Sequence, residues 1–198
     1  FFGRAYDMVV SYTIRQEQDR SAETAPLIEE SIQKVLDVSE EISSLDFYQT
    51  LFKNAITESF TDLADSPDAA SFSQKVDQLI TGTPVTNAKI YMEVPKDSPS
   101  DINALLNKED LKDTFLSLDQ IRGTYWYGIF RGSRVSQLFC PSFYLGTKEQ
   151  KAYGNQAYIT HASVIYNNGT YDAYMAVYYS GHDFQQILSE NLTLDGSV

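Results

Sequence analysis

Histidine and cysteine are scarce in this sequence. Its 198 residues include two histidines, His161 and His182, and one cysteine, Cys140. A single thiol cannot close an internal disulfide, and it cannot build a zinc or iron–sulfur site that needs several cysteines. Two histidines leave little material for a metal centre or for a histidine-based triad. We therefore expect no metal, no cofactor and no enzymatic activity in this chain.

Basic residues are also few. Lys and Arg number 15 against 27 Asp and Glu, which gives a formal charge of −12 at pH 7. This balance disfavours binding to nucleic acid or to an anionic membrane surface, because both carry negative charge themselves. Most acidic residues precede residue 120, whereas 10 of the 14 tyrosines follow it. The distribution predicts solvated helices first and then a sheet with a tyrosine-rich face.

No apolar run is long enough to cross a membrane. The longest uncharged stretch, residues 152–171, contains Asn, Gln, Thr, His and Gly, whereas a membrane-spanning helix needs about 20 mostly apolar residues. No basic leader followed by an apolar core is found either. The chain opens on Phe1-Phe2 without an initiator methionine, and we interpret it as a piece of a longer protein.

The first third of the sequence has helical periodicity. One helix is predicted over residues 5–20, and Thr24 and Pro26 then give a second start signal. The apolar residues that follow recur at helical spacing, opposite a row of mostly acidic side chains, and predict one amphipathic helix of about ten turns that runs on to Phe60. Residues 1–65 would form an N-terminal helical spine. The apolar stripe is Ile28, Ile32, Val35, Ile42, Leu45, Phe47, Leu51 and Ile56.

The rest of the sequence alternates between helical and strand patterns. Ser66 and Pro67 predict the start of a helix that Gly82 ends. The clearest signal is a hairpin, with strands over residues 157–166 and 171–179 around the turn Asn167-Asn168-Gly169. Antiparallel strands with helices outside them make an α+β fold. Further predicted elements are a strand over 88–94, a short helix through Leu111, Phe115 and Leu118, an irregular or short-strand segment over 121–135, a strand over 136–145 and a helix from Asp183.

An aromatic and cationic segment is the best candidate for a binding site. It contains the only tryptophan, Trp126, beside Tyr127 and shortly after Arg122. Aromatic faces bind sugars and cations, and the arginine fork binds carboxylates. Alternate hairpin residues share a face and would complete a pocket wall. In the alternative interpretation, Trp126 and Tyr127 are core residues and the arginines are solvated. The candidate ligand-binding residues are Arg122, Trp126, Tyr127, Tyr166, Asp172 and Tyr174.

The remaining chemical groups are interpreted as structural. Cys140 lies in an apolar strand and is expected to be a small buried residue. His161 falls within a predicted strand and His182 just before a helix, without the spacing of metal ligands, so both are interpreted as structural or exposed. No glycine-rich phosphate-binding loop is recognised.

The layout resembles a known family of sensors. A long N-terminal helix leads to a strand at residues 87–92, followed by Trp126-Tyr127, the hairpin ending at residues 173–179, and a helix from Asp183. This order is similar to the extracellular Cache (PAS-like) region of bacterial sensor histidine kinases, particularly the Gram-positive type that works with AraC-like regulators. The resemblance covers roughly residues 5–192. Residues 66–192 would be the sensor module, and residues 193–198 a linker or the start of a second module.

The resemblance implies a fold and a role. The fold would be a PAS-like antiparallel sheet of about five strands, flanked by a long helix. The domain would lie on the extracellular face between two transmembrane helices, bind a small molecule or a ligand-loaded binding protein, and dimerise through the long helix. Amino-acid-binding members have a single residue between an arginine and Trp-Tyr, whereas three residues separate Arg122 from Trp126 here. A sugar therefore fits the expectation about as well as an amino acid.

Other functions remain open. The same sensor fold occurs in chemoreceptors and other membrane signalling proteins, so the output domain follows from resemblance alone. A non-catalytic dimerisation module is a second alternative. A hydrolase fragment is a third, and it would require converging carboxylates or a triad.

Overall fold

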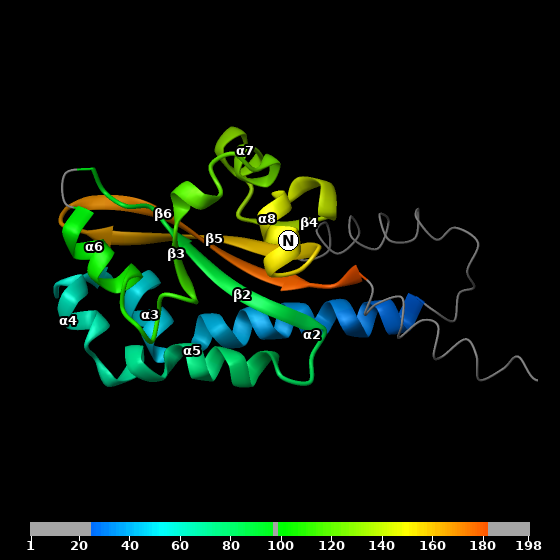
Figure 1. Ribbon diagram of the computed structural model, residues 1–198, viewed down its shortest axis with the longest axis horizontal. Coiled ribbons are helices and arrows are strands. Elements are labelled where there is room, and N and C mark those ends of the chain that lie inside the picture. The colour runs from blue at the N-terminus through cyan, green and yellow to red at the C-terminus, as the bar shows by residue number, and fades with distance from the viewer. Residues whose placement is uncertain (1–24, 97–98, 182–198) are drawn as a thin grey trace, which may run out of the picture.

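The computed structural model describes residues 25–96 and 99–181 of the chain (Figure 1). The helices are α2 (Ala25–Ser44), α3 (Asp46–Phe52), α4 (Phe60–Ala64), α5 (Pro67–Ile80), α6 (Pro99–Leu106), α7 (Tyr125–Gly132) and α8 (Thr147–Ala152), with 3-10 turns η1 (Leu118–Gln120) and η2 (Ser142–Tyr144). The strands are β1 (Ala55–Ile56), β2 (Val85–Met92), β3 (Phe115–Ser117), β4 (Gln137–Cys140), β5 (Gln156–Tyr166) and β6 (Gly169–Tyr179). The predicted α+β class is confirmed.

One mixed sheet organises the described part of the chain. Its six strands follow the order β1-β5-β6-β2-β3, and β4 pairs with the beginning of β5 on the same side as β1. The pairs β5–β6, β2–β6 and β4–β5 are antiparallel, whereas β1 and β3 run parallel to their neighbours. The expected antiparallel sheet of about five strands is therefore correct for β2, β4, β5 and β6 and wrong for the edge strands β1 and β3. The two parallel strands are only two and three residues long, too short for a periodic pattern to reveal them.

The predicted hairpin is confirmed. Tyr166 pairs with Gly169, and the two residues between them, Asn167 and Asn168, have φ angles of 48° and 60°. Positive φ at both central positions is the type I′ geometry, whose twist matches that of the flanking strands. Asparagine tolerates this left-handed region better than most residues do. The tight turn fixes the register of all later pairs along β5 and β6.

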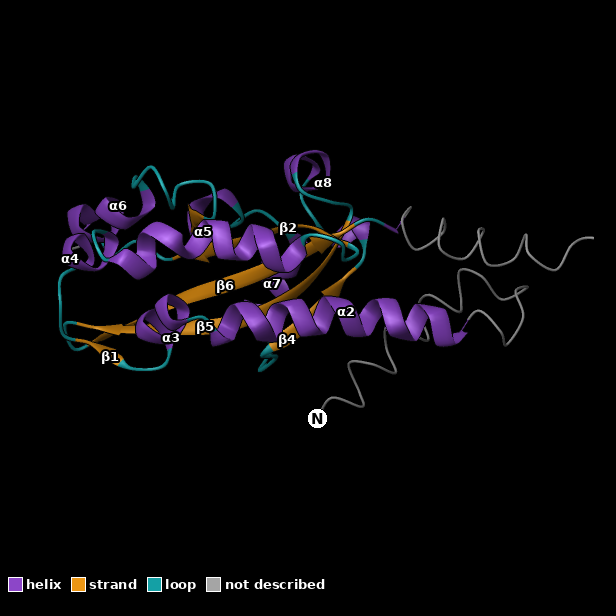
Figure 2. Ribbon diagram, turned by 90° about the horizontal axis from the view of Figure 1, so that it is seen from below, coloured by secondary structure: helices purple, strands orange, loops and turns teal. Residues whose placement is uncertain are grey.

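Helices cover both faces of the sheet. Figure 1 shows α2 and α5 on one side and α7 and α8 on the other, and Figure 2 shows α2 and α5 side by side. Strand β6 serves both layers, because alternate side chains point to opposite faces. Ala173, Met175 and Val177 join the core under α2 and α5. Tyr174 and Tyr178 join the second core, under α7 and α8.

The N-terminal helix is shorter than predicted. It ends at Ser44, and Leu45 adopts an extended conformation before α3 begins at Asp46. The hydroxyls of Ser43 and Ser44 donate to carbonyls four residues earlier, an arrangement that bends or weakens helices. The expected run to Phe60 is therefore wrong, since β1 and a turn intervene. The helices predicted over 5–20 and from Asp183 lie outside the described residues.

Other local predictions had mixed outcomes. Helix α5 is confirmed, with the Ser66 hydroxyl capping it and Gly82 at φ 76° after its end. The segment expected to be irregular or a short strand over 121–135 contains α7, capped by Thr124. The helix expected through Leu111 and Leu118 is wrong, because its middle is strand β3. The strand expected over 136–145 is limited to β4.

Candidate functional site

Trp126 is a core residue. It is fully buried, and its indole Nε1 donates to both oxygens of the Glu149 carboxylate, at 3.2 and 3.3 Å. The same carboxylate accepts from the Tyr178 hydroxyl at 2.6 Å and from the Gly146 amide at 2.7 Å. These bonds join α7, α8 and β6 around one buried anion. The indole N–H already has its partner, so it is not a donor left for a ligand.

A tyrosine pair extends this network across the sheet. The hydroxyls of Tyr91 on β2 and Tyr178 on β6 lie 2.7 Å apart. Since the proton of Tyr178 goes to Glu149, Tyr91 is the donor to Tyr178. Burial raises the pKa of both hydroxyls, and the neighbouring Glu149 charge adds to the effect. Both tyrosines therefore stay protonated and act as hydrogen-bond donors.

Three of the predicted site residues form one aromatic cluster. The ring of Tyr174 lies 5.6 Å from that of Trp126 and 5.8 Å from that of Tyr127, both edge to face. Phe130 completes the cluster at 5.1 Å from Tyr174. The rings pack against one another rather than around an open space. The alternative interpretation of Trp126 as a core residue is the one that the geometry supports, while Tyr127 is only half-buried.

A polar pocket opens beside this cluster. The Asp172 carboxylate lies 2.8 Å from His161 Nε2 and 3.5 Å from Arg131 Nη1. These groups border a hollow of about 330 Å³ on the α7 face of the sheet, which we call the Asp172 pocket. Two predicted residues, Asp172 and Tyr174, line it. The full lining is Phe130, Arg131, Ser133, Arg134, Val135, Ser136, His161, Asp172 and Tyr174.

Arg122 and Tyr166 lie elsewhere. Arg122 is exposed and pairs with Asp119, one helical turn before it. Tyr166 donates from its hydroxyl to Asp101 and packs on the ring of Phe60 at 4.7 Å. Because Tyr166 belongs to the set of β5 side chains that faces α2, it cannot share a pocket with Asp172. The expected common face of these two hairpin residues is therefore wrong.

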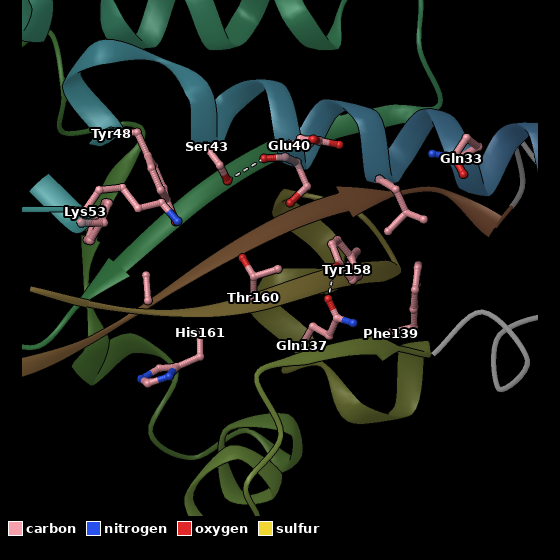
Figure 3. A pocket seen from close by; sticks show the side chains of 14 residues that line it. Gln33, Glu40, Ser43, Tyr48, Lys53, Gln137, Phe139, Tyr158, Thr160 and His161 are labelled. Carbon is pink, nitrogen blue, oxygen red and sulfur yellow. Dashed lines mark hydrogen bonds between the residues drawn. The ribbon is translucent and has the colours of Figure 1, made fainter. Parts of the chain in front are cut away.

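A larger pocket lies on the other side of β5, beneath α2 (Figure 3). Its volume is about 850 Å³, within the usual range for small-molecule sites. We call it the α2 pocket. His161 borders both pockets, and no residue of the predicted site lines this one. Its lining is Gln33, Leu36, Ser39, Glu40, Ser43, Tyr48, Phe52, Lys53, Gln137, Phe139, Tyr158, Thr160, His161 and Ala162.

Metal or thiol chemistry finds no support in residues 25–96 and 99–181. No cluster of three or more His, Cys, Asp or Glu side chains suited to a metal occurs there. Cys140 is buried, and burial raises the pKa of its thiol, with a further contribution from the Glu149 charge. A thiol in such surroundings is unreactive. None of the helices in this part of the chain is both long and apolar enough to cross a bilayer.

Sequence reasoning missed most of the polar pocket. The sequence pattern singles out Arg122 rather than Arg131 or Arg134 and indicates a structural or exposed role for His161. The signal that finds His161 is the hairpin register, because Tyr166 opposite Gly169 places His161 opposite Tyr174 and diagonal to Asp172. Arg131 could be found only by recognising α7 as a helix.

Comparisons with protein-family models, with curated proteins and with solved structures found no match to this chain.

Proposed function

We propose that this chain is a PAS-like sensor domain of the Cache type, the extracellular part of a membrane-bound sensor histidine kinase. In this proposal it binds a small organic molecule without transforming it and passes the signal through its helices to a cytoplasmic output domain. A mixed sheet with helices on both faces is compatible with that fold. A chemoreceptor would use the same domain, and the output part of the protein is what distinguishes the two.

The observation that carries the proposal is the charge pattern of the Asp172 pocket. Two arginines, Arg131 and Arg134, and the acidic Asp172 border one small hollow together with Phe130 and Tyr174. An arginine fork binds a carboxylate in two-point geometry. Asp172 is placed to accept from an ammonium group, and the rings would cover an apolar side chain. The pattern suits a small zwitterion or an organic acid.

A hydrolytic function is the weaker candidate. His161 and Asp172 have the contact of a base with its orienting acid, but a triad also needs a nucleophile bonded to the second imidazole nitrogen. Within the described ranges, no hydroxyl or thiol makes that bond, and the nearby Ser133 hydroxyl donates to the Ile129 carbonyl at 2.7 Å.

The proposed signal passes through the hairpin. Asp172 and His161 belong to β6 and β5, and the opposite face of β6 packs under α2. A ligand whose carboxylate binds Arg131 on α7 and whose ammonium group binds Asp172 on β6 would favour one packing of the strands on α2 over another. The free energy available for the shift is the difference in ligand affinity between the two packings. Helix displacements of about 1–2 Å suffice in known switches.

Calorimetric titration of the 198-residue chain tests this proposal. Glycine, alanine, glutamate and succinate serve as probes, each with the unsubstituted chain and with Arg131→Gln and Asp172→Asn. We expect binding of at least one probe and a loss of roughly tenfold or more in affinity in the variants, because hydrogen bonds to charged groups contribute about 1.5–3 kcal/mol. Arg122→Gln is the matched control, since Arg122 is an exposed, acid-paired arginine outside the pocket.

Two results would contradict the proposal. One is the absence of binding for every probe, and the other is binding that survives in both pocket variants. In the parent protein, the sequence on each side of this domain should contain an apolar span of about 20 residues.

A further inference from the structure

We infer that the α2 pocket is a second binding site, for an uncharged, hydroxyl-rich molecule such as a mono- or disaccharide. The site is separate from the Asp172 pocket and does not depend on the function proposed for it.

The pocket is a gap in the packing of α2 on the sheet. The buried stripe of α2, which includes Ile32, Val35 and Ile42, belongs to the core shared with α5 and β6. A neighbouring stripe of the same helix lines the pocket instead. Its members are spaced three, four and three residues apart, so they lie on one side of the helix. They are Gln33, Leu36, Glu40 and Ser43.

The strands supply the opposite wall. Tyr158, Thr160 and Ala162 alternate along β5 and therefore face the same way, toward α2. Figure 3 shows Thr160 and Tyr158 beneath Glu40 and Ser43, whereas His161 points away to the other side of the strand. The walls thus come from elements far apart in the sequence, and the pocket is formed only by the complete fold.

The lining favours a neutral polar ligand. Neutral hydrogen-bonding groups come from α2, β4 and β5, in the side chains of Gln33, Gln137 and Thr160. The single carboxylate, Glu40, is balanced by the single lysine, Lys53, so the walls offer no excess charge to a phosphate or a dicarboxylate. The hydroxyl groups of a sugar both donate and accept hydrogen bonds. The amide groups offer them donors and acceptors, and the carboxylate offers further acceptors.

Aromatic rings supply the apolar part of the walls. Tyr158, Phe139 and Tyr48 are more than nine-tenths buried and line the pocket together with Phe52. Such surfaces match the C–H faces of a sugar ring. The Tyr158 hydroxyl donates to Gln137 Oε1 at 2.7 Å, which holds the amide in place. Among the described residues, none accepts a hydrogen bond from Gln137 Nε2, so this nitrogen would serve as a donor to a ligand. Polar groups fixed in advance reduce the entropy lost on binding.

Ligand-observed NMR and calorimetry on the 198-residue chain test the inference. Glucose, xylose, maltose and cellobiose are the probes, at millimolar concentrations. Thr160→Val removes one hydroxyl from the pocket without changing the β-branched shape. Thr170→Val is the matched control, because Thr170 is an exposed threonine on the same hairpin and outside the pocket. We expect at least one probe to bind, with affinity reduced about fivefold by Thr160→Val and unchanged by Thr170→Val.

A second variant tests the location of the site by filling the pocket. Ala162→Phe adds a ring on the pocket side of β5 and should abolish saccharide binding, while circular dichroism checks that the chain still folds. If that variant does not fold, Gln137→Leu replaces it, with a similar expected loss. Three results would overturn the inference: no probe binds, binding is equally strong in Thr160→Val and Ala162→Phe, or succinate and glutamate compete with the saccharide for the pocket.

Discussion

Replacing Glu149 removes the buried anion that joins α7, α8 and the sheet. In Glu149→Ala, the Trp126 indole N–H and the Tyr178 hydroxyl both lose their acceptor, and both side chains are fully buried. A buried donor left unpaired costs about 1–3 kcal/mol, so two of them predict a loss of about 2–6 kcal/mol in the free energy of unfolding. The Gly146 amide is only half-buried, and water replaces its bond to Glu149 at little cost.

Thermal and urea unfolding measure this loss. For a chain of this size, about 2–4 °C of Tm corresponds to 1 kcal/mol, so Glu149→Ala should lower Tm by at least about 4 °C. Glu149→Gln keeps one acceptor oxygen, so its Tm should lie between that of the unsubstituted chain and that of Glu149→Ala. Far-UV circular dichroism follows the fold, and the fluorescence of Trp126, the only tryptophan, reports on the site itself.

The matched control is Glu109→Ala. Glu109 is an exposed carboxylate paired with Lys112, and its removal should change stability by less than about 0.5 kcal/mol. Equal unfolding midpoints for Glu149→Ala and Glu109→Ala would refute the reasoning, because the carboxylate would then contribute no more when buried than when exposed.

Three further predictions concern other parts of the fold. Burial raises the pKa of Tyr158 to about 12 in the folded chain, above the value near 10 expected in the unfolded chain. The contribution of Tyr158 to folding stability should therefore be complete below pH 10 and be lost as the pH rises toward 12. The midpoint of urea unfolding should fall over this pH range. Asn168→Val places a β-branched residue at φ 60° and should cost about 1–2 kcal/mol, measured by urea unfolding; an unchanged midpoint would contradict the turn geometry. Cys140 should react with a thiol reagent only after unfolding, so rapid labelling of the native chain would contradict its burial.

Elements with strong local signals could be predicted from the sequence. Two asparagines and a glycine between β-rich runs define the hairpin, and Ser66-Pro67 with Gly82 defines both ends of α5. These signals act within a few residues, so no knowledge of the rest of the chain is needed. Strand β1 carries no such signal, because its two residues are ordered only by pairing with β5.

The two pockets were harder to predict from the sequence, because they too depend on contacts between residues far apart in the chain. Asp172 and Tyr174 were correctly placed on one strand face, but the role of Trp126 depended on Glu149, which lies 23 positions away in the sequence. The aromatic and glycine-rich composition of residues 123–132 concealed helix α7, whose Trp126 and Phe130 are buried one helical turn apart. The α2 pocket requires the position of α2 over β5, which only long-range packing determines.

The place of His161 between the two pockets has a thermodynamic consequence. If both pockets bind, any influence of one occupant on the affinity for the other must be mirrored by an equal influence in return, since the four states form a closed cycle. A titration of either compound in the presence of the other measures that coupling directly. Substituting His161 would disturb both pockets at once, so the informative variants are Thr160→Val for the α2 pocket and Asp172→Asn for the Asp172 pocket.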